Sequence, residues 1–302
     1  MKKASMTARP LLAGLLTGLC LTATSALADA LPQRWVSAGG SLSEWVVALG
    51  GEAKLVGVDT TSLHPASLQG LPKIGYQRQL AAEGILALQP DILLGSEEMG
   101  PPPVLQQLRA AGVRIETLSA KADEKTVHDT IQRLGELLGA VDKAKRAESD
   151  FDARLAAQDA WVKKAQAAQA APGVVLLVGH AGGNLLVAGQ DTSGDWLIQH
   201  AGGRNLATHT GYKTLSSEAL TALNPQVVVL SDRALDGDKA RAALTQQNPG
   251  LAATSAVREG RVLVLDPTLL VGGLGPRIPD GLASLAQAFY PSAQALNTES
   301  RP

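Results

Sequence analysis

A turn that carries a tyrosine and an arginine, Tyr76 and Arg78, holds the most informative chemistry in this sequence. A phenol has a pKa near 10, so keeping Tyr76 as a phenolate at neutral pH costs about 4 kcal/mol. An adjacent guanidinium and a hard ferric ion could together supply that energy, and tyrosine is a known axial ligand of ferric haem. Arg78 could instead bind a ligand carboxylate through two hydrogen bonds. A packed loop tyrosine beside a solvated arginine explains the same residues, and the local sequence alone favours it.

Other polar side chains follow predicted strands. His180 ends an apolar run and precedes Ala-Gly-Gly, where small residues would let a flat ligand approach the backbone; a histidine hydrogen-bonded within a loop explains it equally well. In open parallel α/β sheets the binding site lies beyond the carboxyl ends of the strands. We therefore expect the following candidates to share one region: Tyr76, Arg78, Glu97, Glu98, Met99, His180, Tyr212 and Arg233.

Signatures of catalysis are missing from the sequence. It contains no G-x-S-x-G elbow, no P-loop, no H-E-x-x-H and no Cys/His cluster. Glu97, Glu98 and Asp232 offer carboxylates for acid–base work, but exposed loop carboxylates are far more often solvated. The sequence favours a binding protein over an enzyme, and the remaining histidines are expected to be surface or structural residues: His64, His128, His200 and His209.

A repeated stretch positions the two tyrosine turns. Seven positions separate Glu83 from Pro90 and Glu218 from Pro225, and the second copy starts 135 residues after the first. In each copy a Gly-Tyr turn precedes a short amphipathic helix, and an apolar run follows the proline. Two copies half a chain apart indicate two similar lobes.

Strands and helices alternate in both halves of the 302-residue chain, which predicts three-layer α/β lobes with parallel strands. Ser41 is the expected N-cap of the first helix, over 42–49. Between the halves we expect a rigid spine helix from 141 to about 168, roughly 40 Å long. The strands are expected at 35–37, 55–58, 92–94, 113–118, 174–178, 185–187, 227–230 and 262–265, and the other helices at 83–88, 104–111, 126–138, 195–200 and 281–289.

The first 28 residues read as a signal peptide. Lys2 and Lys3 precede an apolar run over 11–21, and an A-x-A site ends at Ala28. The only cysteine, Cys20, lies in this segment, so the mature chain has no thiol for catalysis, disulfides or metal sites. A formal net charge of −1 gives no support for nucleic-acid binding. We expect an exported, soluble protein.

Three segments (36–44, 55–62 and 75–78) resemble the periplasmic haem-binding proteins that serve haem ABC importers. The Glu-x7-Pro repeats and the spine helix are similar to the wider class III cluster, which includes binding proteins for cobalamin and ferric siderophores. This resemblance implies two Rossmann-like α/β lobes with parallel sheets, joined by one long helix, with the ligand cleft between them. The implied divisions are a signal peptide (1–28), an N-terminal lobe (29–122), a helical segment with the spine (123–170) and a C-terminal lobe (171–302).

The resemblance further implies that the protein carries haem b and is not an enzyme. Tyr76 would be the axial ligand of the haem iron, Arg78 would support the phenolate, and Arg233 would add a contact from the opposite lobe. Tyr212 and Met99 are further expected contacts. His180 sits where a histidine of some relatives helps to hold a second haem.

The same resemblance implies a periplasmic monomer that docks on an ABC permease, and through it meets the ATPase. Relatives dock through acidic residues of each lobe that meet arginines. Glu97 and Asp232 lie 135 positions apart, like the repeat, and are the symmetric candidates. A carrier of ferric siderophores or cobalamin on the same fold is the alternative.

Overall fold

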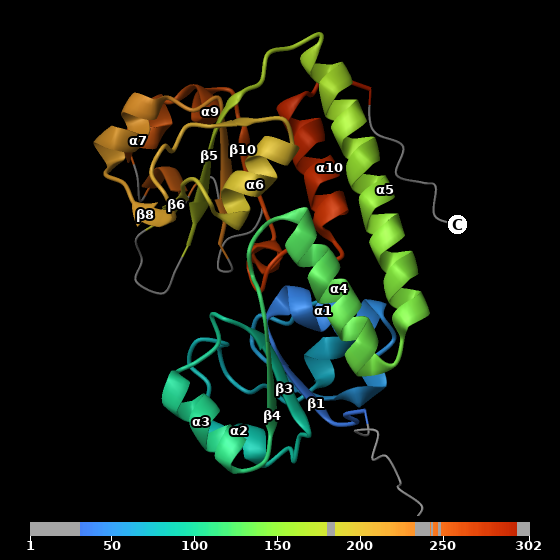
Figure 1. The fold of residues 1–302 in the computed structure, drawn as a ribbon. Coiled ribbons are helices and arrows are strands. Elements are labelled where there is room, and N and C mark those ends of the chain that lie inside the picture. Colours follow the sequence, from blue (N-terminus) through green and yellow to red (C-terminus); the bar gives the residue numbers. More distant parts are fainter. Residues whose placement is uncertain (1–30, 180–184, 233–241, 243, 247–248, 295–302) are drawn as a thin grey trace, which may run out of the picture. The chain divides into compact units, whose positions relative to one another are not determined.

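The computed structural model describes residues 31–179, 185–232, 242, 244–246 and 249–294 of the chain (Figure 1). Three of the sequence predictions lie outside these residues, namely the signal peptide over 1–28, His180 and Arg233.

The first lobe is built on a four-stranded parallel sheet with strand order β2-β1-β3-β4. Its outer faces carry three helices, and the carboxyl ends of its strands lead into the loops that begin at 39, 59 and 97. The strands are β1 (Trp35–Ala38), β2 (Leu55–Val58), β3 (Ile92–Ser96) and β4 (Arg114–Leu118), and the helices are α1 (Gly40–Ala48), α2 (Ala82–Leu86) and α3 (Pro102–Ala110).

The second lobe is built on a six-stranded sheet with the order β10-β9-β5-β6-β8, and β7 also pairs with β5. The strands are β5 (Gly173–Val178), β6 (Leu186–Ala188), β7 (Arg204–Asn205), β8 (Tyr212–Thr214), β9 (Val227–Ser231) and β10 (Val262–Val264). The helices are α6 (Ser193–His200), α7 (Ser217–Leu223), α9 (Ser255–Arg258) and α10 (Ile278–Phe289). Short 3-10 helices in the two lobes span Glu52–Lys54, Ala66–Gly70, Pro249–Ala253 and Pro267–Leu270.

Parallel pairing holds for β5, β9 and β10, as predicted, and β7, which the sequence did not predict, also pairs parallel with β5. By contrast, β6 pairs antiparallel with β5, and β8 pairs antiparallel with β6. The connection between Val178 and Leu186 is too short for a parallel crossover, which needs a dozen residues or more. The second sheet is therefore mixed at the edge that carries Tyr212.

The predicted spine is α5 (Val141–Gln166), a helix of 26 residues, and α4 (Glu124–Leu138) packs beside it (Figure 1). At 1.5 Å per residue, α5 is about 39 Å long. Phe151, Leu155 and Val162 are all buried, so the apolar face expected from the sequence is the face that packs. The helix also contacts α10, which Figure 1 shows alongside it.

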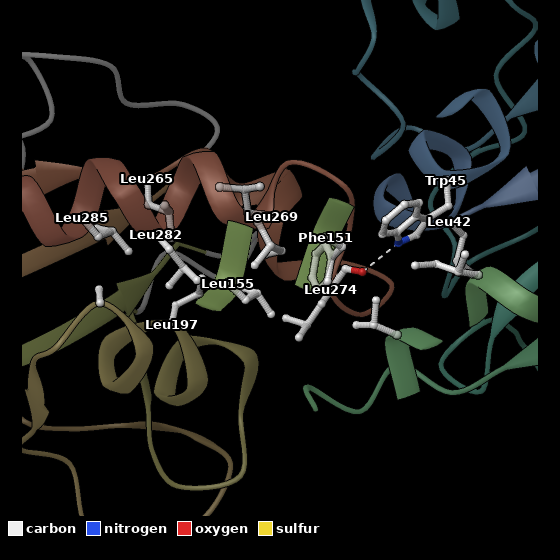
Figure 2. Close-up of a cluster of buried hydrophobic side chains, with 14 of the residues drawn as sticks. Leu42, Trp45, Phe151, Leu155, Leu197, Leu265, Leu269, Leu274, Leu282 and Leu285 are labelled. Carbon is white, nitrogen blue, oxygen red and sulfur yellow. Dashed lines mark hydrogen bonds between the residues drawn. The ribbon is translucent and has the colours of Figure 1, made fainter. Parts of the chain in front are cut away.

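One hydrophobic core runs from the first lobe through α4 and α5 to the second lobe. Figure 2 shows Leu42 and Trp45 at one end and Leu282 and Leu285 at the other. Trp45 packs edge-on against Phe151 with ring centroids 5.8 Å apart, and its indole nitrogen donates to the carbonyl oxygen of Leu274 at 2.9 Å. Each such side chain contributes about 1.5–3 kcal/mol through burial, so this core joins the lobes by packing.

The repeat seen in the sequence is a repeat of backbone conformation. Strands β3 and β9 both begin nine positions after the glutamate of their copy, Glu83 or Glu218. Gln89 and Asn224, each just before the proline, both adopt positive φ, 48° and 40°. A left-handed residue at a helix end turns the chain out of the helix, so both copies enter their strand in the same way.

The predicted N-cap of the first helix was wrong. Helix α1 begins at Gly40 after Gly39, whose φ is 124°, and Ser41 lies inside the first turn. The amide of Gly39 donates to the buried Asp59 carboxylate at 3.1 Å, and the amide of Gly40 donates to the Thr61 hydroxyl at 2.9 Å. Side chains from the loop after β2 therefore replace a local serine cap.

Candidate ligand-binding site

The tyrosine turn presents alternate side chains to solvent. Gly75 adopts a φ of 91°, and the amide of Gln79 donates to the carbonyl of Tyr76 at 2.7 Å, which closes the turn. Tyr76 is 37% exposed and Arg78 is also exposed, whereas Gln77 between them is only 1% exposed. The two residues singled out from the sequence therefore face outward together, on one rigid turn.

Gln77 anchors this turn to the end of β3. Its backbone carbonyl accepts from the amide of Gly100 at 2.9 Å, and the carbonyl of Gly100 accepts from the amide of Leu80 at 2.8 Å. The Gln77 side-chain amide donates to Oε2 of Glu98 at 3.4 Å. Sequence reasoning missed Gln77, because it lies at the centre of a turn, where no strand or helix period indicates which side chain is buried.

Arg78 is paired with Glu98 in this structure. Nη2 of Arg78 lies 2.6 Å from Oε1 of Glu98. This hydrogen bond is the main cause that raises the pKa of Arg78 above its usual value, and the nearby Tyr76 and Tyr212 raise it further. Because both partners are exposed, the pair itself contributes about 1 kcal/mol or less to stability. The pair matters because it places one positive and one negative charge next to the tyrosine turn.

Tyr212 brings the second lobe to the same place. It begins β8 after Gly211, which has a φ of 77°, and it is 38% exposed. The surrounding protein removes water from the phenol and raises its pKa; hydrogen bonds with the Gly194 backbone and the Thr192 side chain lower it in part, as does Arg78. Glu98 raises the same pKa. The two Gly-Tyr turns therefore lie within electrostatic reach of each other.

Other predicted site residues lie in different surroundings. Met99 is buried in the first-lobe core, next to Gly95, and this position gives no support to its assignment as a ligand contact. Glu97 is exposed, and its carboxylate accepts from the amide of Ala120 at 2.8 Å. Asp232 is half-buried beside Gly179, at the end of β9.

The histidines within the described residues have structural contacts, as the sequence predicted. His128 Nε2 lies 2.7 Å from Asp152, His200 stacks on Trp196, and His209 Nε2 lies 3.2 Å from the carbonyl of Val187. Within the same part of the chain, no group of three or more His, Cys, Asp or Glu side chains is arranged to hold a metal ion. Nor does any helix there have the length and apolarity needed to cross a membrane.

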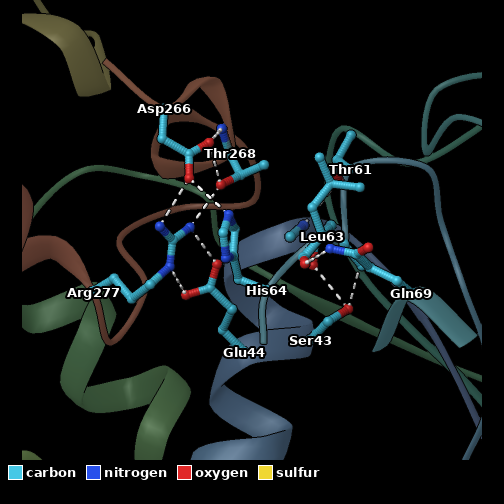
Figure 3. A network of polar contacts seen from close by, with 12 residues as sticks. Ser43, Glu44, Thr61, Leu63, His64, Gln69, Asp266, Thr268 and Arg277 are labelled. Atoms are coloured by element: carbon cyan, nitrogen blue, oxygen red, sulfur yellow. Dashed lines mark hydrogen bonds and ion pairs between the residues drawn. The ribbon is translucent and has the colours of Figure 1, made fainter. Parts of the chain in front are cut away.

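A network of charged side chains joins the loop between β10 and α10 (265–277) to α1 (Figure 3). Arg277 donates to both Glu44 oxygens, at 2.7 and 2.8 Å, and to Asp266 at 2.9 Å. His64 Nε2 lies 3.0 Å from the same Asp266 oxygen. Burial raises the pKa of Glu44 although Arg277 opposes it. Burial also acts to raise the pKa of Asp266, but hydrogen bonds from Thr268 and Arg277 outweigh it and the pKa is lowered.

A hollow of about 580 Å³ lies beside β10 and α10, lined in part by Val264, Leu265 and Leu285. None of the residues of the two tyrosine turns lines it. Its charged residues Asp266, Arg277 and Asp280 are already paired: Arg277 contacts both Glu44 and Asp266, and Asp280 contacts Arg154. The tyrosine turns are therefore the better candidate for ligand recognition.

Comparison with known proteins gives consistent matches. The sequence profile of the family described as periplasmic binding protein matches residues 36–269. A periplasmic haem-binding protein from Pseudomonas aeruginosa is 67% identical, with a TM-score of 0.87, and the match covers 89% of this chain and 96% of that one. The periplasmic haem-binding protein RhuT from Roseiflexus sp. RS-1 is 35% identical, with a TM-score of 0.80 over 87% and 99% of the chains. A vitamin B12-binding protein from Pectobacterium atrosepticum is 25% identical over 71% of this chain and 76% of its own.

Proposed function

Since the chain belongs to the periplasmic binding protein family, we propose that it captures ferric haem in the periplasm and delivers it to an ABC importer of the inner membrane. Similar proteins described as haem-binding, at 67% and 35% identity over most of both chains, support this ligand. The observation that carries the proposal is the exposed Tyr76 beside Arg78, on a turn that Gln77 holds rigid. The family consists of binding proteins, so no catalytic turnover is assigned.

In this proposal Tyr76 is the axial ligand of the haem iron, as a phenolate. A phenolate oxygen is a hard anionic donor suited to ferric iron, and Arg78 supplies the positive charge that favours the ionised form. Tyr212 faces the ligand from the second lobe. Haem b is the proposed cargo, and the ligand cleft lies between the two lobes. Further contacts are proposed for Arg233 and His180.

Export and docking complete the proposal. Residues 1–28 act as the signal peptide, and the mature protein works as a monomer with lobes at 29–122 and 171–302 and a helical segment over 123–170. Glu97 and Asp232 meet arginines of the permease, one from each lobe, and the ATPase is met through the permease. The exposure of Glu97 supports such a role, because its hydrogen bond to Ala120 leaves its charge at the surface.

An absorbance titration with ferric haem tests the ligand and its coordination. The wild type should show a saturable Soret change and a tyrosinate charge-transfer band. Tyr76→Phe removes only the phenol oxygen and should abolish that band, whereas Tyr212→Phe should keep it even where affinity falls. A wild type without a saturable change would reject haem as the ligand.

Cobalamin or a ferric siderophore is the alternative cargo, favoured by the similarity to a vitamin B12-binding protein. A ferric siderophore site usually needs no metal ligand from the protein. Tyr76→Ala should then leave binding intact, and cobalamin or ferric siderophore should bind the wild type in the same titration where haem does not.

A further inference from the structure

The Glu98 carboxylate is held between two side chains of the tyrosine turn. Oε1 accepts from Arg78 at 2.6 Å, and Oε2 accepts from the buried amide of Gln77 at 3.4 Å. The amide of Glu98 in turn donates to the hydroxyl of Ser96 at the end of β3, at 3.3 Å. The carboxylate is therefore aimed at the guanidinium by contacts beneath it.

In this arrangement two anionic groups, Glu98 and the bound ligand or phenolate, compete for the single guanidinium of Arg78. If Arg78 is to stabilise a phenolate or a ligand carboxylate, Glu98 already occupies part of its hydrogen-bonding edge and offsets its charge. The charges of Glu98 and Arg78 act on Tyr212 in opposite directions, as expected for two groups of opposite sign at one site. The net potential that the site offers to an anionic ligand is thus lower than Arg78 alone would give.

We propose that Glu98 is a built-in counter-ion that competes with the bound ligand for Arg78. In the empty protein it holds the guanidinium ready on the turn. In the loaded protein the charge of Glu98 weakens the attraction between Arg78 and the anionic ligand. When the ligand leaves, Glu98 forms its ion pair with Arg78 again. This inference rests on the proposed haem site and assigns to it a residue that limits affinity and favours release.

Glu98→Gln tests the competition with little change of shape, since the glutamine keeps an oxygen for Gln77. Haem transfer from the loaded protein to excess apomyoglobin gives the release rate. We expect haem release from Glu98→Gln to slow roughly threefold to tenfold. The change is modest because the electrostatic interaction of exposed charges is weak, and it appears in the release rate because affinity changes are mostly changes in dissociation rate. Glu83→Gln, an exposed glutamate of the same lobe, is the matched control.

A double-mutant cycle asks whether Glu98 acts through Arg78. In an Arg78→Gln background, Glu98→Gln should change the release rate less than about twofold. An equal effect in both backgrounds would overturn the inference, as would unchanged or faster release from Glu98→Gln alone. A wild type that binds no haem would instead reject the proposed function, so the two failures are distinguishable.

Discussion

Replacing Arg277 with methionine tests how much the ion pairs between α1 and the loop over 265–277 contribute to stability. Methionine keeps roughly the aliphatic part of the arginine side chain but has no charge, so it leaves Glu44 without its main partner while that residue is only 4% exposed. Removing one partner of a buried ion pair costs about 3–5 kcal/mol, because the remaining charge stays desolvated. Arg277 itself is 29% exposed and Asp266 is also partly exposed, so we expect the lower end, about 3 kcal/mol at pH 7.5.

The cost of Arg277→Met should depend on pH in one direction. Burial already raises the pKa of Glu44 while Arg277 opposes it, so removing Arg277 raises that pKa further. A carboxyl with a raised pKa binds its proton more tightly in the folded state, so the variant loses stability as the pH rises from the unfolded pKa, about 4.5, through the folded one. The difference between wild type and variant should therefore be smaller at pH 5 than at pH 7.5.

Urea denaturation followed by tryptophan fluorescence at both pH values measures this difference. Arg154→Met is the matched control, because it breaks an exposed ion pair with Asp280 and should cost about 1 kcal/mol or less. A loss for Arg277→Met no larger than the control loss, or one that grows as the pH falls, would refute the reasoning.

Three further substitutions test other contacts. The pKa of His128 is raised, chiefly by its hydrogen bond with Asp152. The stability lost in His128→Gln should therefore be greatest below about pH 6.5 and vanish as the pH rises through the folded pKa. Urea denaturation across this pH range measures the loss. Tyr290→Phe removes the hydroxyl that donates to the carbonyl of Gly202 at 2.5 Å; it should cost about 1–2 kcal/mol, and a neutral result would mean that water replaces the hydroxyl. Asp59→Asn replaces an acceptor of several buried hydrogen bonds and should cost roughly 3 kcal/mol, seen as a lower denaturation midpoint.

Much of the fold could be predicted from the sequence, because its signals are local. The period of apolar residues located all four strands of the first lobe and the spine helix, within two residues at each end. The repeat gave the two-lobed plan, and its prolines marked where both copies leave their helix. These features depend on residues close together in the chain.

The errors and omissions concern partners that lie far apart in the chain. The cap of α1 comes from Asp59 and Thr61, about twenty residues beyond the helix start, so a nearby serine seemed sufficient. Arg277 lies 233 positions from Glu44, and no periodicity links them. Glu98 looked like a solvated loop carboxylate because its partner Arg78 is twenty positions away. A pattern predicts that a charge is present but not which group it meets.

The two tyrosine turns share a backbone plan, yet the chemistry built on them differs. Tyr76 shares its turn with Gln77 and Arg78, which both contact Glu98, whereas Tyr212 is contacted by the Gly194 backbone and the Thr192 side chain. Burial raises the pKa of Tyr212, which disfavours a phenolate there. The described contacts thus place the Arg78–Glu98 ion pair beside Tyr76, whereas they disfavour ionisation of Tyr212. For this reason we place the iron ligand on Tyr76, and a tyrosinate band that survives Tyr76→Phe but is lost in Tyr212→Phe would reverse that assignment.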